Sequence, residues 1–298
     1  MCGIVGLFLK DKKLEPKLGE MLSDMLIVMS DRGPDSAGIA VYSDPKKGKS
    51  KITVQSDDPK SAFRTLSKDL EKALKIKVKL DKRDTHAVLT VPTKSVDAIR
   101  AEIAENHEQV RVMSSGEVVE IYKEVGLPAE VVDRFDVRKM TGSHGVGHTR
   151  MATESAVTTL GAHPFSTDED QCLVHNGSLS NHNSLRRKLI REGMTFETEN
   201  DTEVGAAYIA NQMQNGAKLG DALEASLKDL DGFYTFVIGT KDGFGVLRDP
   251  IACKPAVLAE TDRYVAFGSE YRALAGLPGI EKAKVWEPEP ATVYFWEH

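Results

Sequence analysis

The chain begins Met1-Cys2-Gly3-Ile4, and its second residue is the most informative in the sequence. Removal of the initiator methionine, which the small side chain of Cys2 permits, would make Cys2 the N-terminal residue. Its thiol would then share one residue with a free α-amino group, whose pKa of about 8 lets it accept the thiol proton. This pair is the cysteine counterpart of an N-terminal threonine nucleophile. The alternative interpretation is a small apolar residue that opens a strand.

Length, charge and cysteine spacing limit the classes of function. A chain of 298 residues can form one large domain or a domain with an insertion, and its formal net charge of −6 argues against general nucleic-acid binding. Cys2, Cys172 and Cys253 lie far apart, so the sequence predicts no metal site, cysteine-ligated cluster or disulfide framework. No apolar run approaches the roughly 18 residues of a membrane span. We therefore expect a cytoplasmic protein with reduced thiols.

The apolar pattern outside the middle of the chain predicts an α+β fold. Residues 2–9 are typical of a buried strand, residues 14–29 of a helix with one apolar face, and residues 38–42 of a second strand. From residue 145 onward, short glycine-rich strands are joined by turns. Helices are expected in that part at 181–192, 202–215 and 219–230. Strands joined by short turns favour antiparallel sheets, and grouped helices favour layers outside them.

Residues 46–140 interrupt this pattern, and we expect them to form an inserted α/β subdomain within a domain that spans residues 2–298. The elements expected from residue 52 to residue 113 follow the order β-α-β-β-α-β, which is that of a ferredoxin-like subdomain. Residues 117–140 are expected to connect it onward. Lysines and arginines outnumber acidic residues between Lys46 and Arg83. This basic excess is either a docking surface for an acidic partner or a solvated face.

Arg150 lies near the end of a strand expected at residues 146–151, and Thr153 lies three residues further on. The guanidinium group of Arg150 could hold a carboxylate through two hydrogen bonds, and the hydroxyl group of Thr153 could add another. The alternative is a surface arginine after a strand, which is common in proteins.

Asn176-Gly177 follows a strand expected at residues 171–175. The side-chain N–H of Asn176 and the backbone N–H of Gly177 are two donors that can converge on one point, as an oxyanion hole requires. The alternative is a plain Asn-Gly turn, which is the strongest short signal for a hairpin.

Asp201 stands where a helix is expected to begin. An aspartate at this position is typical of an N-cap. A carboxylate without a partner in a cleft could instead bind an ammonium group. Two later segments, Arg248-Asp249-Pro250 and Ser269-Glu270, are expected to be structural turns.

The order of these motifs along the chain resembles that of the class II glutamine amidotransferases. The resemblance covers residues 2–43 and about 144–296. Its motifs are Cys2, Arg32-Gly33-Pro34-Asp35-Ser36, His148-Thr149-Arg150, His163-Pro164-Phe165, His175-Asn176-Gly177, Asp201-Thr202-Glu203 and Arg248-Asp249-Pro250. The resemblance implies the N-terminal-nucleophile fold, which is an αββα sandwich of two antiparallel sheets between helix layers.

The resemblance also implies a role for each candidate residue. The thiol of Cys2 attacks the side-chain amide of L-glutamine to give a γ-glutamyl thioester and ammonia, and water then releases glutamate. The other implied roles are oxyanion stabilisation by Asn176 and Gly177, α-carboxylate binding by Arg150 and Thr153, and α-ammonium binding by Asp201. The chain departs from many family members at Met151 and at Glu154-Ser155, and this difference concerns the wall of the glutamine pocket.

No phosphoribosyl, sugar-isomerase or ATP-pyrophosphatase module is recognisable up to His298. The long insertion instead resembles that of free-standing amidotransferase subunits of the glutamate-synthase type. That group includes the small subunit of N-methylglutamate synthase, which serves methylamine metabolism. The resemblance implies glutamate-synthase-like partner subunits in a hetero-oligomer. FMN and an iron–sulfur cluster would belong to those partners, and no cofactor is expected in this chain.

Two alternatives to this function stay open. The chain could be an amidotransferase subunit that serves another ammonia acceptor, or a non-catalytic subunit that senses glutamine or acts as a scaffold. Catalysis is favoured because Cys2, Asn176, Gly177, Arg150 and Asp201 are all intact, whereas a decayed site should have lost at least one of them.

Overall fold

The computed structural model describes residues 2–152 and 156–298, whose strands form three sheets. The first sheet contains β1 (Gly3–Leu9), β2 (Ser36–Tyr42), β7 (Val119–Val125), β8 (His144–Arg150), β12 (Val257–Glu260), β13 (Tyr264–Gly268) and β14 (Lys284–Trp286). The second contains β9 (Cys172–Leu179), β10 (Gly232–Gly239), β11 (Gly243–Arg248) and β15 (Thr292–Glu297). Their strand orders are β14-β12-β13-β1-β8-β2-β7 and β15-β11-β10-β9, and every pairing is antiparallel.

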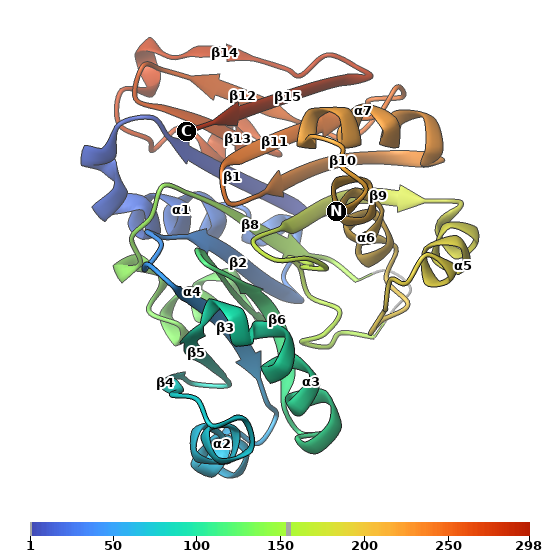
Figure 1. Cartoon of the computed structure of the whole chain (residues 1–298). Coiled ribbons are helices and arrows are strands. Elements are labelled where there is room, and N and C mark those ends of the chain that lie inside the picture. Colours follow the sequence, from blue (N-terminus) through green and yellow to red (C-terminus); the bar gives the residue numbers. More distant parts are fainter. Residues whose placement is uncertain (1, 153–155) are drawn as a thin grey trace.

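Helices cover the outer face of each sheet, and the two inner faces pack together (Figure 1). On the first sheet, α1 (Leu18–Ile27) and α4 (Pro128–Arg134) share an apolar core with β1 and β2. The second sheet is covered by α5 (His182–Arg191), α6 (Asp201–Gln214) and α7 (Leu219–Asp229). Apolar side chains such as Ile4, Val146 and Phe244 fill the space between the sheets. This arrangement confirms the expected αββα sandwich.

Strand β1 occupies the middle of the first sheet and is buried along its whole length. It pairs with β8 on one side and with β13 on the other. A Cβ atom at Gly6 would lie 2.5 Å from Cε2 of Phe244 in β11, which is closer than a side chain tolerates. Glycine at this position therefore allows the two sheets to approach each other directly over the strand that follows Cys2.

The helices expected near the C-terminal half are confirmed, whereas the first helix differs from its prediction. The segment 14–29 divides into a 3-10 helix at Lys12–Lys17 and the α-helix α1, which begins at Leu18. Pro16 lies in the 3-10 segment. Because proline has no backbone N–H, it cannot donate the hydrogen bond that a regular α-helix would form there. None of the described helices combines the length and the apolarity that crossing a membrane requires.

The inserted segment forms the third sheet, at the end of the molecule opposite β12 and β14 (Figure 1). Its elements are β3 (Lys49–Gln55), α2 (Pro59–Leu74), β4 (Lys79–Arg83), β5 (His86–Pro92), α3 (Val96–Asn106) and β6 (Arg111–Gly116). The strand order β4-β5-β3-β6 interleaves two βαβ units, as in a ferredoxin-like subdomain. Its two helices and sheet bury an apolar core of their own.

The structure sets the end of the insertion earlier than residue 140. Strand β7 pairs along its whole length with β2 of the first sheet, and α4 packs into the core beneath that sheet. Residues 119–140 therefore belong to the main body. The alternating pattern of β7 marks a strand, but it does not indicate which distant strand will pair with it.

Candidate active site

Cys2 lies at the start of β1, where the end of β8 passes beside it. Gly3 is opposite Thr149 in the sheet, and the Sγ atom of Cys2 lies 4.0 Å from the carbonyl oxygen of Met151. The residue is partly exposed to solvent. Its carbonyl oxygen accepts two hydrogen bonds, from Nε of Arg32 at 3.0 Å and from Nδ2 of Asn176 at 3.3 Å. The backbone that carries the thiol is therefore fixed from two sides.

Cys2 differs from the other two cysteines in its surroundings. Cys172 is fully buried and contacts the hydroxyl group of Tyr42 at 3.2 Å. This burial raises the pKa of its thiol to about 12, so Cys172 is not a thiolate near neutral pH. Cys253 is exposed and lies in the loop after β11. Of the three, Cys2 alone stands beside the other candidate residues.

Arg32 holds the backbone of Cys2, a contact that the sequence analysis did not predict. The side chain is 9% exposed, and its Nη1 atom pairs with Glu270 at 2.5 Å. The hydrogen bond from Arg32 lowers the pKa of Glu270, and this carboxylate also pairs with Arg272 at 2.7 Å. Arg32 is therefore a positioning residue whose own orientation is fixed by Glu270. In the sequence Arg32 directly precedes Gly33-Pro34, and this local context does not indicate a pairing with a residue far along the chain.

The segment Ser269-Glu270 also contacts the N-terminal strand, so describing it only as a structural turn is wrong. The hydroxyl oxygen of Ser269 accepts a hydrogen bond from the backbone N–H of Ile4 at 2.9 Å. The backbone N–H of Ser269 donates in return to the carbonyl oxygen of Ile4. By contrast, Asp249 accepts from Ile251 and Ala252, as a turn residue is expected to do.

Asn176 and Gly177 lie inside β9, so the alternative of a hairpin turn between strands is wrong. They stand opposite Thr235 and Tyr234 of β10. Gly177 has a φ angle of 149°, and a Cβ atom there would lie 1.9 Å from the carbonyl oxygen of Phe233. The strand passes so close to β10 at this residue, next to Asn176, that only glycine fits. The amide itself points toward Cys2, as the hydrogen bond to its carbonyl oxygen requires.

Arg150 is the last residue of β8 and is 6% exposed, so it is not a surface arginine. It lies opposite Ser36 in β2, and its carbonyl oxygen accepts a hydrogen bond from Asp35. Its Nη1 atom contacts the carbonyl oxygen of Ala156 at 3.4 Å. The guanidinium group is thus held where the chain leaves β8 next to Cys2. Thr153 lies outside the described residues.

Asp201 is the first residue of α6, and it is not the N-cap. That position belongs to Asn200, whose side-chain oxygen accepts from the N–H of Thr202 at 2.9 Å. The Oδ2 atom of Asp201 accepts from the backbone N–H of Leu179 at 2.9 Å, and its Oδ1 atom lies 3.7 Å from Nδ1 of His175. The carboxylate therefore sits beside the same strand that carries Asn176, and its side chain is 24% exposed.

Three buried histidines connect the strands and the helix of the site, and the sequence analysis treated them only as parts of motifs. His148 and His163 stack with ring centroids 4.1 Å apart, and Nε2 of His148 donates to the carbonyl oxygen of His175. The hydroxyl group of Thr202 bridges Nε2 of His163 at 2.7 Å and Nδ1 of His175 at 3.0 Å. Burial lowers the pKa of His148 to about 3 and lowers those of the other two, so all three are neutral near pH 7.

The structure joins Cys2 directly to Asn176, while Arg150 ends the strand that pairs with β1 and Asp201 contacts the strand β9 that carries Asn176 and Gly177. The thiol and the amide donor are the groups needed to attack a side-chain amide. The buried guanidinium group and the partly exposed carboxylate are suited to a substrate that also carries an α-carboxylate and an α-ammonium group. No group of three or more His, Cys, Asp or Glu side chains in residues 2–152 and 156–298 is placed to hold a metal ion.

Known proteins resemble this chain both in sequence and in fold. A family described as "Glutamine amidotransferase domain" matches residues 148–276. The "Glutamine amidotransferase-like protein GlxB" of Rhizobium meliloti (strain 1021) is 66% identical over 298 residues, which cover 100% of this chain and 99% of that protein. The sequence relationship therefore extends over both chains.

Two solved structures show the same fold at low sequence identity. The "allosteric regulatory enzyme of purine biosynthesis" matches with a TM-score of 0.65 and 20% identity, over 99% of this chain and 47% of that one. The glutamine phosphoribosylpyrophosphate amidotransferase from B. subtilis matches with a TM-score of 0.63 and the same identity and coverage. These matches agree with the N-terminal-nucleophile fold that the motif order implied.

Proposed function

Because the chain belongs to the class II glutamine amidotransferase family, we propose that it is a glutaminase subunit that hydrolyses L-glutamine through Cys2. The observation that carries the proposal is the 3.3 Å contact between Nδ2 of Asn176 and the carbonyl oxygen of Cys2. An amide nitrogen has two N–H donors. One is used to hold the backbone of Cys2, and the other is left for an oxyanion that forms at the thiol of the same residue.

The proposed reaction uses the N-terminal amine as the base. The amine accepts the proton of the Cys2 thiol, and the sulfur attacks the side-chain amide carbon of glutamine. The tetrahedral oxyanion is stabilised by the amide of Asn176 and the backbone N–H of Gly177. The C–N bond then breaks, and the amine returns its proton to the departing ammonia. Water hydrolyses the γ-glutamyl thioester to glutamate and restores the thiol.

Substrate recognition in this proposal depends on one charge of each sign. The guanidinium group of Arg150 binds the α-carboxylate of glutamine, and the carboxylate of Asp201 binds its α-ammonium group. Thr153 adds a hydrogen bond to the α-carboxylate. The burial of Arg150 and the partial exposure of Asp201 support these roles, since a charge in a recess recognises a ligand more strongly than a fully solvated charge.

We further propose that the chain works in a hetero-oligomer with glutamate-synthase-like partner subunits, of which N-methylglutamate synthase is the leading candidate. In that complex FMN and an iron–sulfur cluster would be carried by the partners. Ammonia released at Cys2 protonates and diffuses away unless it reaches an acceptor through a closed path, which favours a partner bound next to this chain. An amidotransferase subunit that serves another acceptor fits the same site.

A basic stripe on α2 supports docking through the insertion. Lys60, Arg64, Lys68 and Lys72 repeat every four residues, are all exposed, and make no ion pair among the described residues. Like charges at this spacing destabilise a helix by about 0.2–0.5 kcal/mol per pair. An acidic partner surface would relieve the repulsion between these like charges.

Replacing Cys2 tests the central part of the proposal. Cys2→Ala should abolish glutamate release from glutamine, because no other thiol stands beside Asn176, while Cys253→Ala should leave the rate unchanged. The measurement is glutamate formation by the chain together with its copurifying partners. Retained turnover in Cys2→Ala would contradict the mechanism. Glutamine binding by an unmodified chain that shows no turnover would identify a glutamine-sensing subunit instead.

The roles proposed for Asn176 and Arg150 predict opposite kinetic effects. Asn176→Ala should lower kcat by about 10²–10³ with little change in KM, because an oxyanion donor acts mainly in the transition state. Arg150→Lys should mainly raise KM, because an ammonium group cannot form the paired hydrogen bonds of a guanidinium group. Steady-state glutaminase kinetics measure both parameters. If the two variants changed the same parameter, the assigned roles would be wrong.

Reversing charges on α2 tests the docking proposal. The combined variant Arg64→Glu, Lys68→Glu and Lys72→Glu should weaken assembly with the partner, most strongly at low salt because salt screens exposed charges, while glutaminase turnover survives. The matched control reverses three exposed charges on α5, at Arg187, Lys188 and Arg191. Analytical ultracentrifugation of the mixed subunits measures assembly. Normal assembly of the α2 variant would exclude the stripe as the docking element.

A further inference from the structure

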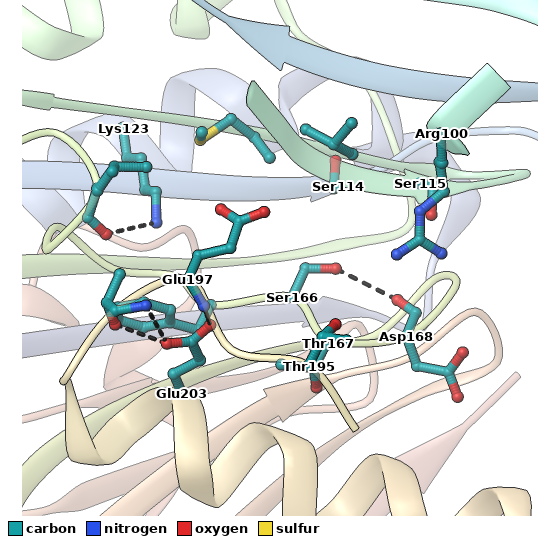
Figure 2. Close-up of a pocket in the computed structure, with 15 residues that line it drawn as sticks. Arg100, Ser114, Ser115, Lys123, Ser166, Thr167, Asp168, Thr195, Glu197 and Glu203 are labelled. Carbon is teal, nitrogen blue, oxygen red and sulfur yellow. Dashed lines mark hydrogen bonds between the residues drawn. The ribbon is translucent and has the colours of Figure 1, made fainter. Parts of the chain in front are cut away.

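A recess lies at the junction of the insertion and the main body, and it includes none of the residues of the candidate active site (Figure 2). Its walls come from α3 and β6 of the insertion, from β7, from the segment 165–168 and from the segment 195–203. The recess encloses about 90 Å³ and is lined mainly by hydroxyl and charged groups. Its size suits a small polar molecule.

Two of the charged groups at the recess are already used to hold its walls. Lys123 is buried and donates hydrogen bonds to the carbonyl oxygens of Leu160, Ala162 and Pro164 at 2.8–3.2 Å. The carboxylate of Glu203 accepts hydrogen bonds from the backbone N–H groups of the segment 197–198 at 2.8 and 2.9 Å. These contacts fix the two loops between which the recess lies. Neither group needs a ligand to satisfy it.

A third lining carboxylate, that of Asp168, accepts a hydrogen bond from Nε2 of Gln214 at 3.0 Å. Two further charged groups line the recess on side chains that are exposed to solvent, and they have no such partner. The guanidinium group of Arg100 and the carboxylate of Glu197 make no hydrogen bond or ion pair within the described part of the chain. Both side chains are directed into the recess from opposite walls (Figure 2). Water is partly removed from around Glu197, and Glu203 lies nearby, and together these effects raise its pKa. The charges of Lys123, Arg111 and Arg100, in that order, act in the opposite direction on the pKa of the same carboxyl group.

Ser114 adds an independent sign that a ligand is missing. Its side chain is 2% exposed and lines the recess, and its hydroxyl oxygen has no hydrogen-bond partner. A buried hydroxyl group without a partner costs roughly 1–3 kcal/mol, and such groups are rare in folded proteins. A polar molecule in the recess would satisfy this hydroxyl group as well as the two charges.

We propose that this recess binds a small zwitterion of the α-amino acid class, with its carboxylate on Arg100, its ammonium group on Glu197 and a hydrogen bond to Ser114. A zwitterion satisfies one charge of each sign and adds no net charge. A simple anion would face the carboxylates of Glu197 and Glu203, and a simple cation would face Arg100 and Lys123. The proposal does not depend on the glutaminase activity.

Calorimetric titration of the full chain with glycine, L-alanine and L-serine tests the proposal, because these amino acids lack the γ-amide of glutamine. We expect binding that Arg100→Gln and Glu197→Gln each weaken by about tenfold or more, as the loss of a charged hydrogen bond predicts. Glu105→Gln, which removes an exposed charge from α3, is the matched control and should bind normally. Asp201→Asn should also bind normally, because Asp201 lies outside the recess.

Analogues that lack one charge test the class of ligand. Glycine methyl ester has no carboxylate and N-acetylglycine has no ammonium group, and both should bind at least about tenfold more weakly than glycine. Equal binding of either analogue would show that the recess recognises a single charge and would overturn the proposal. It would also be overturned if none of the three amino acids bound, if both recess variants bound normally, or if Asp201→Asn alone abolished binding.

Discussion

The position of the Cys2 backbone is the constraint on which the rest of the site depends. Its carbonyl oxygen receives hydrogen bonds from Arg32 and Asn176, which belong to different layers of the sandwich. Glu270 holds the guanidinium group of Arg32 in turn. Gly3 pairs with Thr149 of β8 and Ile4 is hydrogen-bonded to Ser269 after β13, so the residues next to Cys2 are held on both sides. A nucleophile at the flexible end of a chain is thereby given a fixed place.

The remaining candidate groups are placed by elements that converge on that position. The end of β8, the interior of β9 and the start of α6 carry the guanidinium, amide and carboxylate groups, and neutral histidines join these elements behind them. Thr202 is the common partner of His163 and His175. Because protonation of such buried rings is unfavourable, the network keeps one hydrogen-bonding pattern near neutral pH. The glutamine site proposed here is therefore supported by a rigid polar core.

Much of the fold and the chemical groups of the site could be predicted from local sequence, whereas their partners could not. The α+β class follows from hydrophobic periodicity, and Asn176-Gly177 was recognised as a candidate oxyanion hole from residue types. The placement of that pair inside β9 depends on pairing with β10, which local turn propensity does not report. The role of Arg32 depends on Glu270, far along the chain, and β7 joins the main sheet by pairing with β2. All three are non-local contacts.

Whether Cys2 acts as an N-terminal residue can be measured directly. The mechanism needs a free α-amino group on Cys2, so the active protein must have lost Met1. Intact-mass spectrometry of the active chain, with its glutaminase rate determined on the same sample, is the decisive measurement. We expect a mass lower by one methionine residue, and a rate that follows the fraction of processed chain. Full activity in a chain that retains Met1 would contradict the proposed role of the N-terminal amine.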